Sequence, residues 1–160
     1  MRAVCPGSFD PIAHGHVDII GRAAALFGDV IVAVGRNSAK NYLFDTDERV
    51  ELARAATAQV DGVRVEVLSG LLVDFCRSRD AGYVVKGLRF ASDFDFELQM
   101  AHINRSLTGL ETVLLPASSQ RGTLSSTMVR EVASLGGDVG AFVPALVAER
   151  IQQKRKSNDG

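Results

Sequence analysis

Short apolar runs recur along the chain, and each is followed by a segment with helical periodicity. Residues 30–35 form a continuous β-branched run, which suits a strand buried on both faces of a parallel sheet. Comparable runs lie at residues 1–4, 63–68, 83–86 and 111–115, and helical patterns at residues 17–27, 45–60, 71–79, 93–107, 125–135 and 144–154. Five strands that alternate with helices predict an α/β fold with a doubly wound, five-stranded parallel sheet.

The length of the chain indicates one domain. At 160 residues the chain is long enough to bury a substantial core, and no linker or internal repeat divides it. We expect the domain to span residues 1–153 and the charged tail at residues 154–160 to be frayed. Hydrophobic residues make up 46% of the chain and charged residues 23%, which are ordinary values for a soluble globular protein.

Charge, hydropathy and cysteine content argue against several classes of protein. The net charge of −1 gives no strong field for nucleic acid or an anionic membrane, so any phosphate must be bound by local cations. No apolar run approaches the ~20 residues that a membrane helix needs, and the N-terminus lacks a leader pattern. Cys5 and Cys76 lie in apolar contexts without metal-ligand spacing, which indicates free thiols in a reducing compartment. We therefore expect a cytoplasmic protein without a nucleic-acid or membrane partner.

The first apolar run leads into a turn punctuated by glycine and proline at residues 4–16. Gly7 lets the backbone approach a ligand closely, and Ser8 supplies a hydroxyl. The helix that opens near His16 offers free N–H groups and a positive dipole end. Ligands of open parallel sheets bind beyond the carboxyl ends of the strands. The turn therefore predicts an anion site faced by His16, although a strand–turn–helix corner with solvated histidines has the same spacing.

A second cluster follows the fourth expected strand. Lys86 and Arg89 flank the Gly87-Leu88 pair, which combines close backbone access with two cations for phosphate oxygens. A surface turn with two solvated cations would have the same composition. Lys40, in the polar loop after the second strand, is a further candidate for binding a phosphate, and on its own it is equally a solvated lysine.

Hydroxyl side chains gather at the start of the helix expected at residues 125–135. Ser125, Ser126 and Thr127 follow Leu124 there, and hydroxyls at a helix N-terminus combine capping with phosphate binding. Serine and threonine are also common caps without any ligand, so this signal is weak by itself.

Taken together, these motifs resemble those of the bacterial phosphopantetheine adenylyltransferases, a family of the nucleotidyltransferase superfamily. Residues 6–16 contain the (T/S)-F-D-x-x-x-x-G-H signature, residues 86–89 the (K/R)-G-L-R motif, and residues 93–99 resemble the D-F-x-x-E-x-Q segment. The chain departs from the wider pattern at Ala13, where the superfamily often has histidine. It also has Arg121-Gly122-Thr123 where the family usually has an aromatic residue followed by serine.

The resemblance implies a single-domain, Rossmann-like nucleotidyltransferase fold and a defined reaction. AMP would pass from ATP to 4′-phosphopantetheine by direct in-line attack, giving dephospho-coenzyme A and pyrophosphate without a covalent enzyme intermediate. His16 would be the catalytic residue. The ATP-binding set implied by the motifs is Ser8, Phe9, His16, Gly87, Leu88, Arg89, Glu97, Arg121, Gly122, Thr123, Leu124, Ser125, Ser126 and Thr127. The acceptor-binding set is Ser8, Lys40, Leu72 and Lys86, although Leu72 is equally a core residue at a helix start.

Further expectations come from the resemblance alone. Mg²⁺ would enter with ATP and be coordinated mainly by phosphates and water, without a protein ligand. The family also implies a homohexamer and feedback binding of coenzyme A.

Two alternatives remain open. One is another nucleotidyltransferase, such as a glycerol-3-phosphate cytidylyltransferase or a nicotinate-mononucleotide adenylyltransferase, against which the second and third motifs weigh. The other is a nucleotide sensor without turnover, against which the joint presence of His16, Lys40 and Arg89 argues. The chain contains no zinc-ligand spacing, P-loop, nucleophile elbow or G-x-G-x-x-G turn after the first strand.

Overall fold

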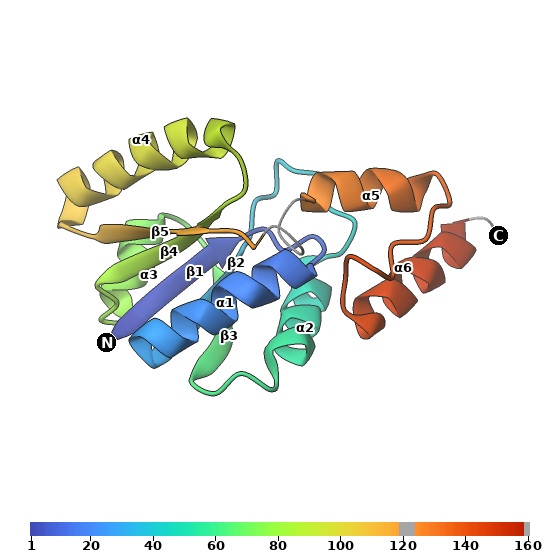
Figure 1. Ribbon diagram of the computed structural model, residues 1–160, viewed down its shortest axis with the longest axis horizontal. Helices are drawn as coiled ribbons and strands as arrows, with labels where there is room; N and C mark the ends of the chain where they lie inside the picture. Colours follow the sequence, from blue (N-terminus) through green and yellow to red (C-terminus); the bar gives the residue numbers. More distant parts are fainter. Residues whose placement is uncertain (119–123, 159–160) are drawn as a thin grey trace.

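Five strands form one parallel sheet in the part of the chain that the structure describes (Figure 1). The computed structural model describes residues 1–118 and 124–158. The strands are β1 (Arg2–Gly7), β2 (Asp29–Gly35), β3 (Val63–Leu68), β4 (Tyr83–Leu88) and β5 (Glu111–Pro116). The helices are α1 (His14–Phe27), α2 (Thr46–Thr57), α3 (Leu72–Ser78), α4 (Ala91–Thr108), α5 (Ser126–Ser134) and α6 (Ala145–Asn158). The predicted α/β fold with a five-stranded parallel sheet is confirmed.

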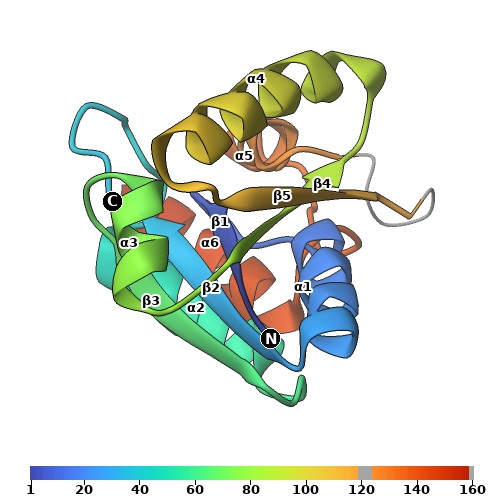
Figure 2. The same cartoon turned by 90° about the vertical axis from the view of Figure 1, so that its left-hand side faces the viewer.

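Alternate residues of the central strands enter two separate cores, because successive side chains of a strand point to opposite faces. Val30, Val32 and Val34 of β2 pack in the larger core with α1 and α2, whereas Ile31 and Ala33 pack with α3. Figure 2 shows α1 and α2 on one side of the sheet and α3 and α4 on the other. Burial on both faces explains why residues 30–35 form an uninterrupted apolar run in the sequence.

The strand order, β3-β2-β1-β4-β5, places the topological switch between β1 and β4. These two strands pair only at Ala3 with Tyr83 and at Val4 with Val84, although both continue further. Their carboxyl-terminal halves therefore separate and leave room between them. A crevice of this kind at the switch point is where open α/β sheets bind their ligands.

Helix α2 begins with a capping box. The Asp45 side chain accepts a hydrogen bond from the Glu48 amide at 2.8 Å, and the Glu48 side chain accepts one from the Asp45 amide at 2.9 Å. The backbone amides of Asp45 and Glu48, which have no partner within the helix, thereby gain hydrogen bonds.

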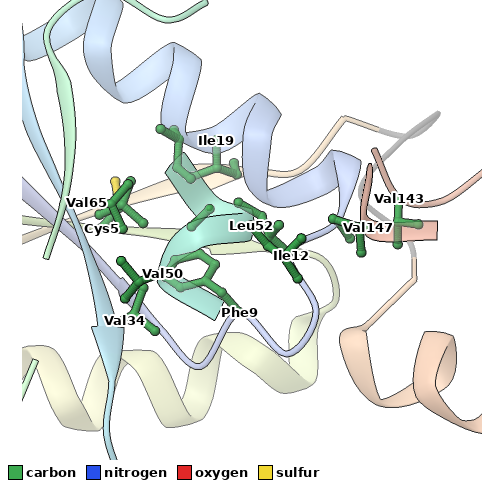
Figure 3. Packing of buried hydrophobic residues seen from close by; sticks show 14 of the residues in the cluster. Cys5, Phe9, Ile12, Ile19, Val34, Val50, Leu52, Val65, Val143 and Val147 are labelled. Atoms are coloured by element: carbon green, nitrogen blue, oxygen red, sulfur yellow. The ribbon is translucent and has the colours of Figure 1, made fainter. Parts of the chain in front are cut away.

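Helix α6 runs to Asn158, four residues beyond the end at Lys154 that the sequence pattern suggested. Residues 154–157 contain neither glycine nor proline to stop the helix, and Lys154 forms a 2.9 Å ion pair with Glu48 of α2. Val143 and Val147 anchor this end of the chain in the larger core, near Ile12 of the first turn (Figure 3).

Both cysteines are buried free thiols, as their apolar contexts suggested. Burial raises the pKa of Cys5 to about 12 and that of Cys76 to about 11, so neither is a thiolate at neutral pH. Among the described helices, none combines the length and the apolar character needed to cross a bilayer.

Candidate active site

A cavity of about 580 Å³ lies at the carboxyl ends of β1 and β4, at the switch point of the sheet. The turn after β1, the start of α1, the end of β4 and the first turn of α5 all contribute to its walls. Lys40 reaches it from the loop after β2. The turn at residues 6–16, the end of β4 at residues 86–89 and the start of α5 at residues 125–127 are distant in sequence and converge on this cavity.

The turn after β1 restricts which residues fit at positions 7 and 9. A side chain at Gly7 would place a Cβ 3.0 Å from the ring of Phe9, which is tighter than ordinary packing. Phe9 itself has a φ of 49°, in the left-handed region that non-glycine residues rarely adopt, and its ring is 5% exposed. Strained residues of this kind persist where surrounding structure holds them and are typical of ligand sites.

The imidazole of His16 is fixed in one orientation. Its Nδ1 accepts a hydrogen bond from the Ala13 amide at 2.9 Å, and its ring packs edge-on against Phe9 with centroids 5.2 Å apart. Because Nδ1 is an acceptor, the neutral ring carries its proton on Nε2. The side chain therefore offers one N–H donor, and His16 is part of the cavity lining.

Burial, followed by the charges of Arg89 and Lys86, lowers the pKa of His16 to about 4. The ring is consequently a neutral donor at physiological pH. A neutral imidazole can hydrogen-bond to a phosphate oxygen without exchanging a proton with it.

The two cations at the carboxyl end of β4, Lys86 within the strand and Arg89 just after it, are each paired with a carboxylate of α4. Lys86 forms a 3.1 Å ion pair with Glu97, and the guanidinium of Arg89 donates to both carboxylate oxygens of Asp93, at 3.2 and 3.3 Å. Asp93 and Glu97 are four residues apart on one helix, so they lie on the same face. Both cations are held at the rim of the cavity by side chains that a ligand can replace.

Gly87 between these cations is required by packing. A Cβ at this position would lie 3.0 Å from Cγ1 of Ile19 on α1. The glycine therefore lets α1, with His16 in its first turn, approach β4 closely. This approach brings the histidine and the cations to the same cavity.

The start of α5 presents hydroxyls and backbone amides to the same space. Ser125 caps the helix by accepting from the Met128 amide at 3.2 Å, while Ser126 donates to the carbonyl of Pro11 at 2.9 Å. Ser126 thereby joins α5 to the first turn across more than a hundred residues of sequence. With Thr127, these residues line the cavity at a helix N-terminus, which suits an anion.

Comparison with known proteins identifies the family. Residues 4–132 match the cytidylyltransferase-like family. The phosphopantetheine adenylyltransferase of Streptomyces coelicolor is 53% identical over 98% of both chains. That of Pseudarthrobacter chlorophenolicus is 55% identical over 94% of this chain and 91% of its own. The chain belongs to the phosphopantetheine adenylyltransferase family. The recognition drawn from the motifs, and with it a nucleotidyltransferase enzyme, is confirmed.

A solved structure supports the fold independently. A lipopolysaccharide core biosynthesis protein from Thermoplasma volcanium is 20% identical, with a TM-score of 0.54 over 74% of this chain and 96% of its own. At this identity the likeness shows the shared nucleotidyltransferase-type α/β fold alone.

Most site residues predicted for a phosphopantetheine adenylyltransferase lie together in the cavity. Those in its lining are Ser8, Phe9, His16, Lys40, Lys86, Gly87, Arg89, Glu97, Leu124, Ser125, Ser126 and Thr127. Leu88 and Leu72 are outside this lining; Leu88 borders a shallow neighbouring hollow, and Leu72 packs against the smaller core. Arg121, Gly122 and Thr123 lie outside the described residues. The individual roles stay predictions.

The sequence analysis did not assign Asp10 and Arg130, which also line the cavity. Asp10 is 1% exposed and accepts hydrogen bonds from the amides of Leu43 and Phe44, at 2.7 and 2.9 Å. Arg130 donates to the Asp10 carbonyl and lies 3.8 Å from its carboxylate. Asp10 belongs to the first motif, and its carboxylate joins the turn after β1 to the amides of residues 43 and 44.

Proposed function

We propose that this chain transfers AMP from ATP to 4′-phosphopantetheine, forming dephospho-coenzyme A and pyrophosphate. The observation that carries the proposal is the convergence of a neutral imidazole, several cations that include Lys86 and Arg89, and a helix N-terminus on one cavity at the switch point. This arrangement suits a reaction in which two anions must be brought together.

In the proposed step an oxygen of the acceptor phosphate attacks the α-phosphorus of ATP in line with the leaving group. The new bond joins that oxygen to the α-phosphorus, and the bond from the α-phosphorus to the bridging oxygen breaks. Pyrophosphate leaves with the electron pair of the broken bond. No side chain forms a covalent bond, so the protein contributes positioning and charge stabilisation.

The lining residues divide this work by position. His16 donates its Nε2 proton in a hydrogen bond to an α-phosphate oxygen, where negative charge accumulates in the transition state. Lys40 and Lys86 place the acceptor phosphate. Ser8, in the turn after β1, binds the acceptor phosphate or the α-phosphate. Arg89 and residues 125–127 at the start of α5 hold the β- and γ-phosphates.

Mg²⁺ is proposed to accompany ATP. Magnesium keeps several waters and is commonly held by substrate phosphates with one or two carboxylates at most. The two carboxylates of the described lining are already engaged, Asp10 with backbone amides and Glu97 with Lys86. The residues thus fit an ion that the phosphates and water coordinate, and when bound it would offset phosphate charge.

The outer face of α4 supports the proposed homohexamer. Phe96, Ile103 and Leu107 are 64%, 50% and 58% exposed and recur at helical spacing along that face. Contiguous exposed apolar residues are typical of protein interfaces. We propose that α4 packs against other copies of the chain in the cytoplasm. We also propose, separately, that coenzyme A acts as a feedback ligand. Sedimentation of wild type and Phe96→Glu tests the assembly, since a smaller species is expected from the variant.

Pyrophosphate release from MgATP tests the reaction. We expect release with 4′-phosphopantetheine and none with glycerol 3-phosphate or nicotinate mononucleotide as the acceptor. Release with another acceptor would leave the proposed ATP-phosphate site in place but contradict the assignment of Lys40 and Lys86 to phosphopantetheine. ATP binding without release from any acceptor would favour a nucleotide sensor.

A further inference from the structure

Arg49, on the first turns of α2, is a buried charge outside the cavity lining. Its exposed fraction is 0%, and it is among the largest fully buried side chains of the described chain. Within the described residues, no carboxylate lies in ion-pair distance of its guanidinium. Burying a charge without a counter-ion is costly, and apolar residues often replace buried charges without loss of stability. The fold by itself therefore gives little reason for an arginine here.

The guanidinium instead binds backbone carbonyls around the site. Nη1 donates to the carbonyls of Ser8 at 2.7 Å and Gly35 at 2.9 Å, and Nε donates to that of Phe44 at 3.2 Å. Nη2 donates to the Thr46 hydroxyl at 3.3 Å, and the guanidinium lies 3.9 Å from the centre of the Tyr42 ring. Only the planar, multidentate guanidinium can satisfy acceptors in several directions at once.

The positions of these carbonyls have a functional consequence. Gly35 and Phe44 stand at the two ends of the loop that carries Lys40, and Ser8 belongs to the turn after β1. A single side chain therefore closes the base of the Lys40 loop and joins it to the Ser8 turn. Asp10 makes a second tie between the same segments through the amides of Leu43 and Phe44.

We propose that Arg49 is a positioning residue for the acceptor phosphate, acting through the Lys40 loop and Ser8. This inference rests on the proposed reaction and goes beyond it, because Arg49 lies outside the cavity lining. Arg89 follows β4, and residues 125–127 form the start of α5. Arg49 makes no hydrogen bond to either segment in the described chain. Loss of Arg49 should therefore affect the acceptor more than ATP.

Steady-state kinetics of Arg49→Met and Arg49→Lys test the inference. We expect Arg49→Met to raise KM for phosphopantetheine by about 10–100-fold, the effect of misplacing a binding group by about 1 Å, while KM for ATP changes less than about 3-fold. Arg49→Lys should be intermediate, since an ammonium keeps the charge but cannot reach all three carbonyls. Calorimetric titration with phosphopantetheine, without ATP, should show the same loss of affinity.

Two variants of α2 serve as matched controls. Arg54→Met removes an arginine that also donates to a backbone carbonyl, that of Val65 in β3, and neither residue lines the cavity. Leu52→Val weakens the core beneath the same helix, where Leu52 is 0% exposed. Both controls should keep the wild-type ratio of the two KM values even where Leu52→Val lowers Tm.

Hydrogen exchange gives a measurement that needs no activity. Amides of residues 36–44 should exchange at least about 10-fold faster in Arg49→Lys and Arg49→Met than in Leu52→Val, because local opening of the loop no longer has to break the Arg49 bonds.

Wild-type KM values and unchanged exchange in both Arg49 variants would overturn the inference. Failure of both variants to fold would also overturn it, since Arg49 would then determine the fold. An inactive wild type would refute the proposed reaction, and the exchange data would still decide whether Arg49 fixes the loop.

Discussion

The two halves of the cavity hold their functional groups by different means. On the β1–α1 side, His16 is fixed by a backbone amide, and the carboxylate of Asp10 is engaged by two further amides. On the β4–α4 side, Lys86 and Arg89 are held by carboxylate side chains of a helix that is mostly exposed. Backbone bonds survive ligand binding, whereas partly exposed ion pairs contribute little stability and are readily exchanged.

This difference matches what each half has to do. A donor to the transition state must be in place before the reaction, because preorganised groups need no rearrangement as charge develops. A cation that binds a phosphate must separate from its carboxylate partner and pair with the phosphate instead. Glu97 and Asp93 hold Lys86 and Arg89 at the cavity in the free protein. For the proposed reaction, we expect the substrate phosphates to replace these carboxylates as partners of the two cations.

Replacement of His16 should have the largest effect. We expect His16→Ala to lower kcat by about 10²–10³, the size of losing one preorganised donor, with a small change in KM for ATP. His14→Ala is the matched control, because His14 lies on the same helical turn but outside the cavity lining, and it should stay within a few-fold of wild type. Near-normal turnover by His16→Ala in the pyrophosphate assay would remove the distinction between the two halves.

The cations should show effects of intermediate size that separate by substrate. Arg89→Met is expected to raise KM for ATP, and Lys86→Met that for phosphopantetheine, each by about 10–100-fold, as for a charged hydrogen bond worth about 1.5–3 kcal/mol. Arg105→Met, which removes an exposed ion pair at the far end of α4, should change neither constant. If Lys86→Met and Arg89→Met alter the same KM, the two cations do not serve separate substrates.

Asp93 should give a smaller effect, on stability as well as on ATP. Burial opposes ionisation of Asp93, but hydrogen bonds from the Arg89 side chain and backbone outweigh it and lower its pKa. A lowered folded-state pKa means that the carboxylate stabilises the fold above its unfolded pKa of about 4 and loses this contribution as pH falls through the folded value. Asp93→Asn should therefore cost about 0.5–1 kcal/mol at pH 7, as a carboxylate in the first turn of a helix, and raise KM for ATP a few-fold.

Urea unfolding at pH 7 and pH 3 checks the Asp93 prediction, with Asp95→Asn as the control. Asp95 is exposed on the same turn of α4. The difference in free energy of unfolding between wild type and Asp93→Asn should shrink at the lower pH. An equal difference at both values would show that the charge of Asp93 is not what stabilises the helix start.

The sequence predicted the layers of the fold and the convergence of the motifs because both follow from local patterns. Apolar runs buried on two faces identify strands, and the switch-point rule then collects the turns after them. The bonds of Arg49 and Asp10 could not be predicted in this way. They join carbonyls and amides of segments up to 41 residues apart, and backbone acceptors leave no pattern of residue types in the sequence. The outward face of α4 was missed for a related reason, since Phe96, Ile103 and Leu107 have a helical spacing that is equally consistent with burial in the core.

The smallest expected effect is the absence of a histidine titration in the rate. With a pKa of about 4, His16 stays neutral from pH 5.5 to 8, so its contribution to kcat should be constant over that range. The ratio of kcat for wild type to kcat for His16→Ala isolates this contribution, because ionisation of the substrate phosphates cancels. A flat ratio would support a donor whose protonation state is fixed by burial and by the neighbouring cations. A step in the ratio near pH 6.5 would mean that the imidazole is solvated like an ordinary histidine, and the β1–α1 half would then be no more preorganised than the β4–α4 half.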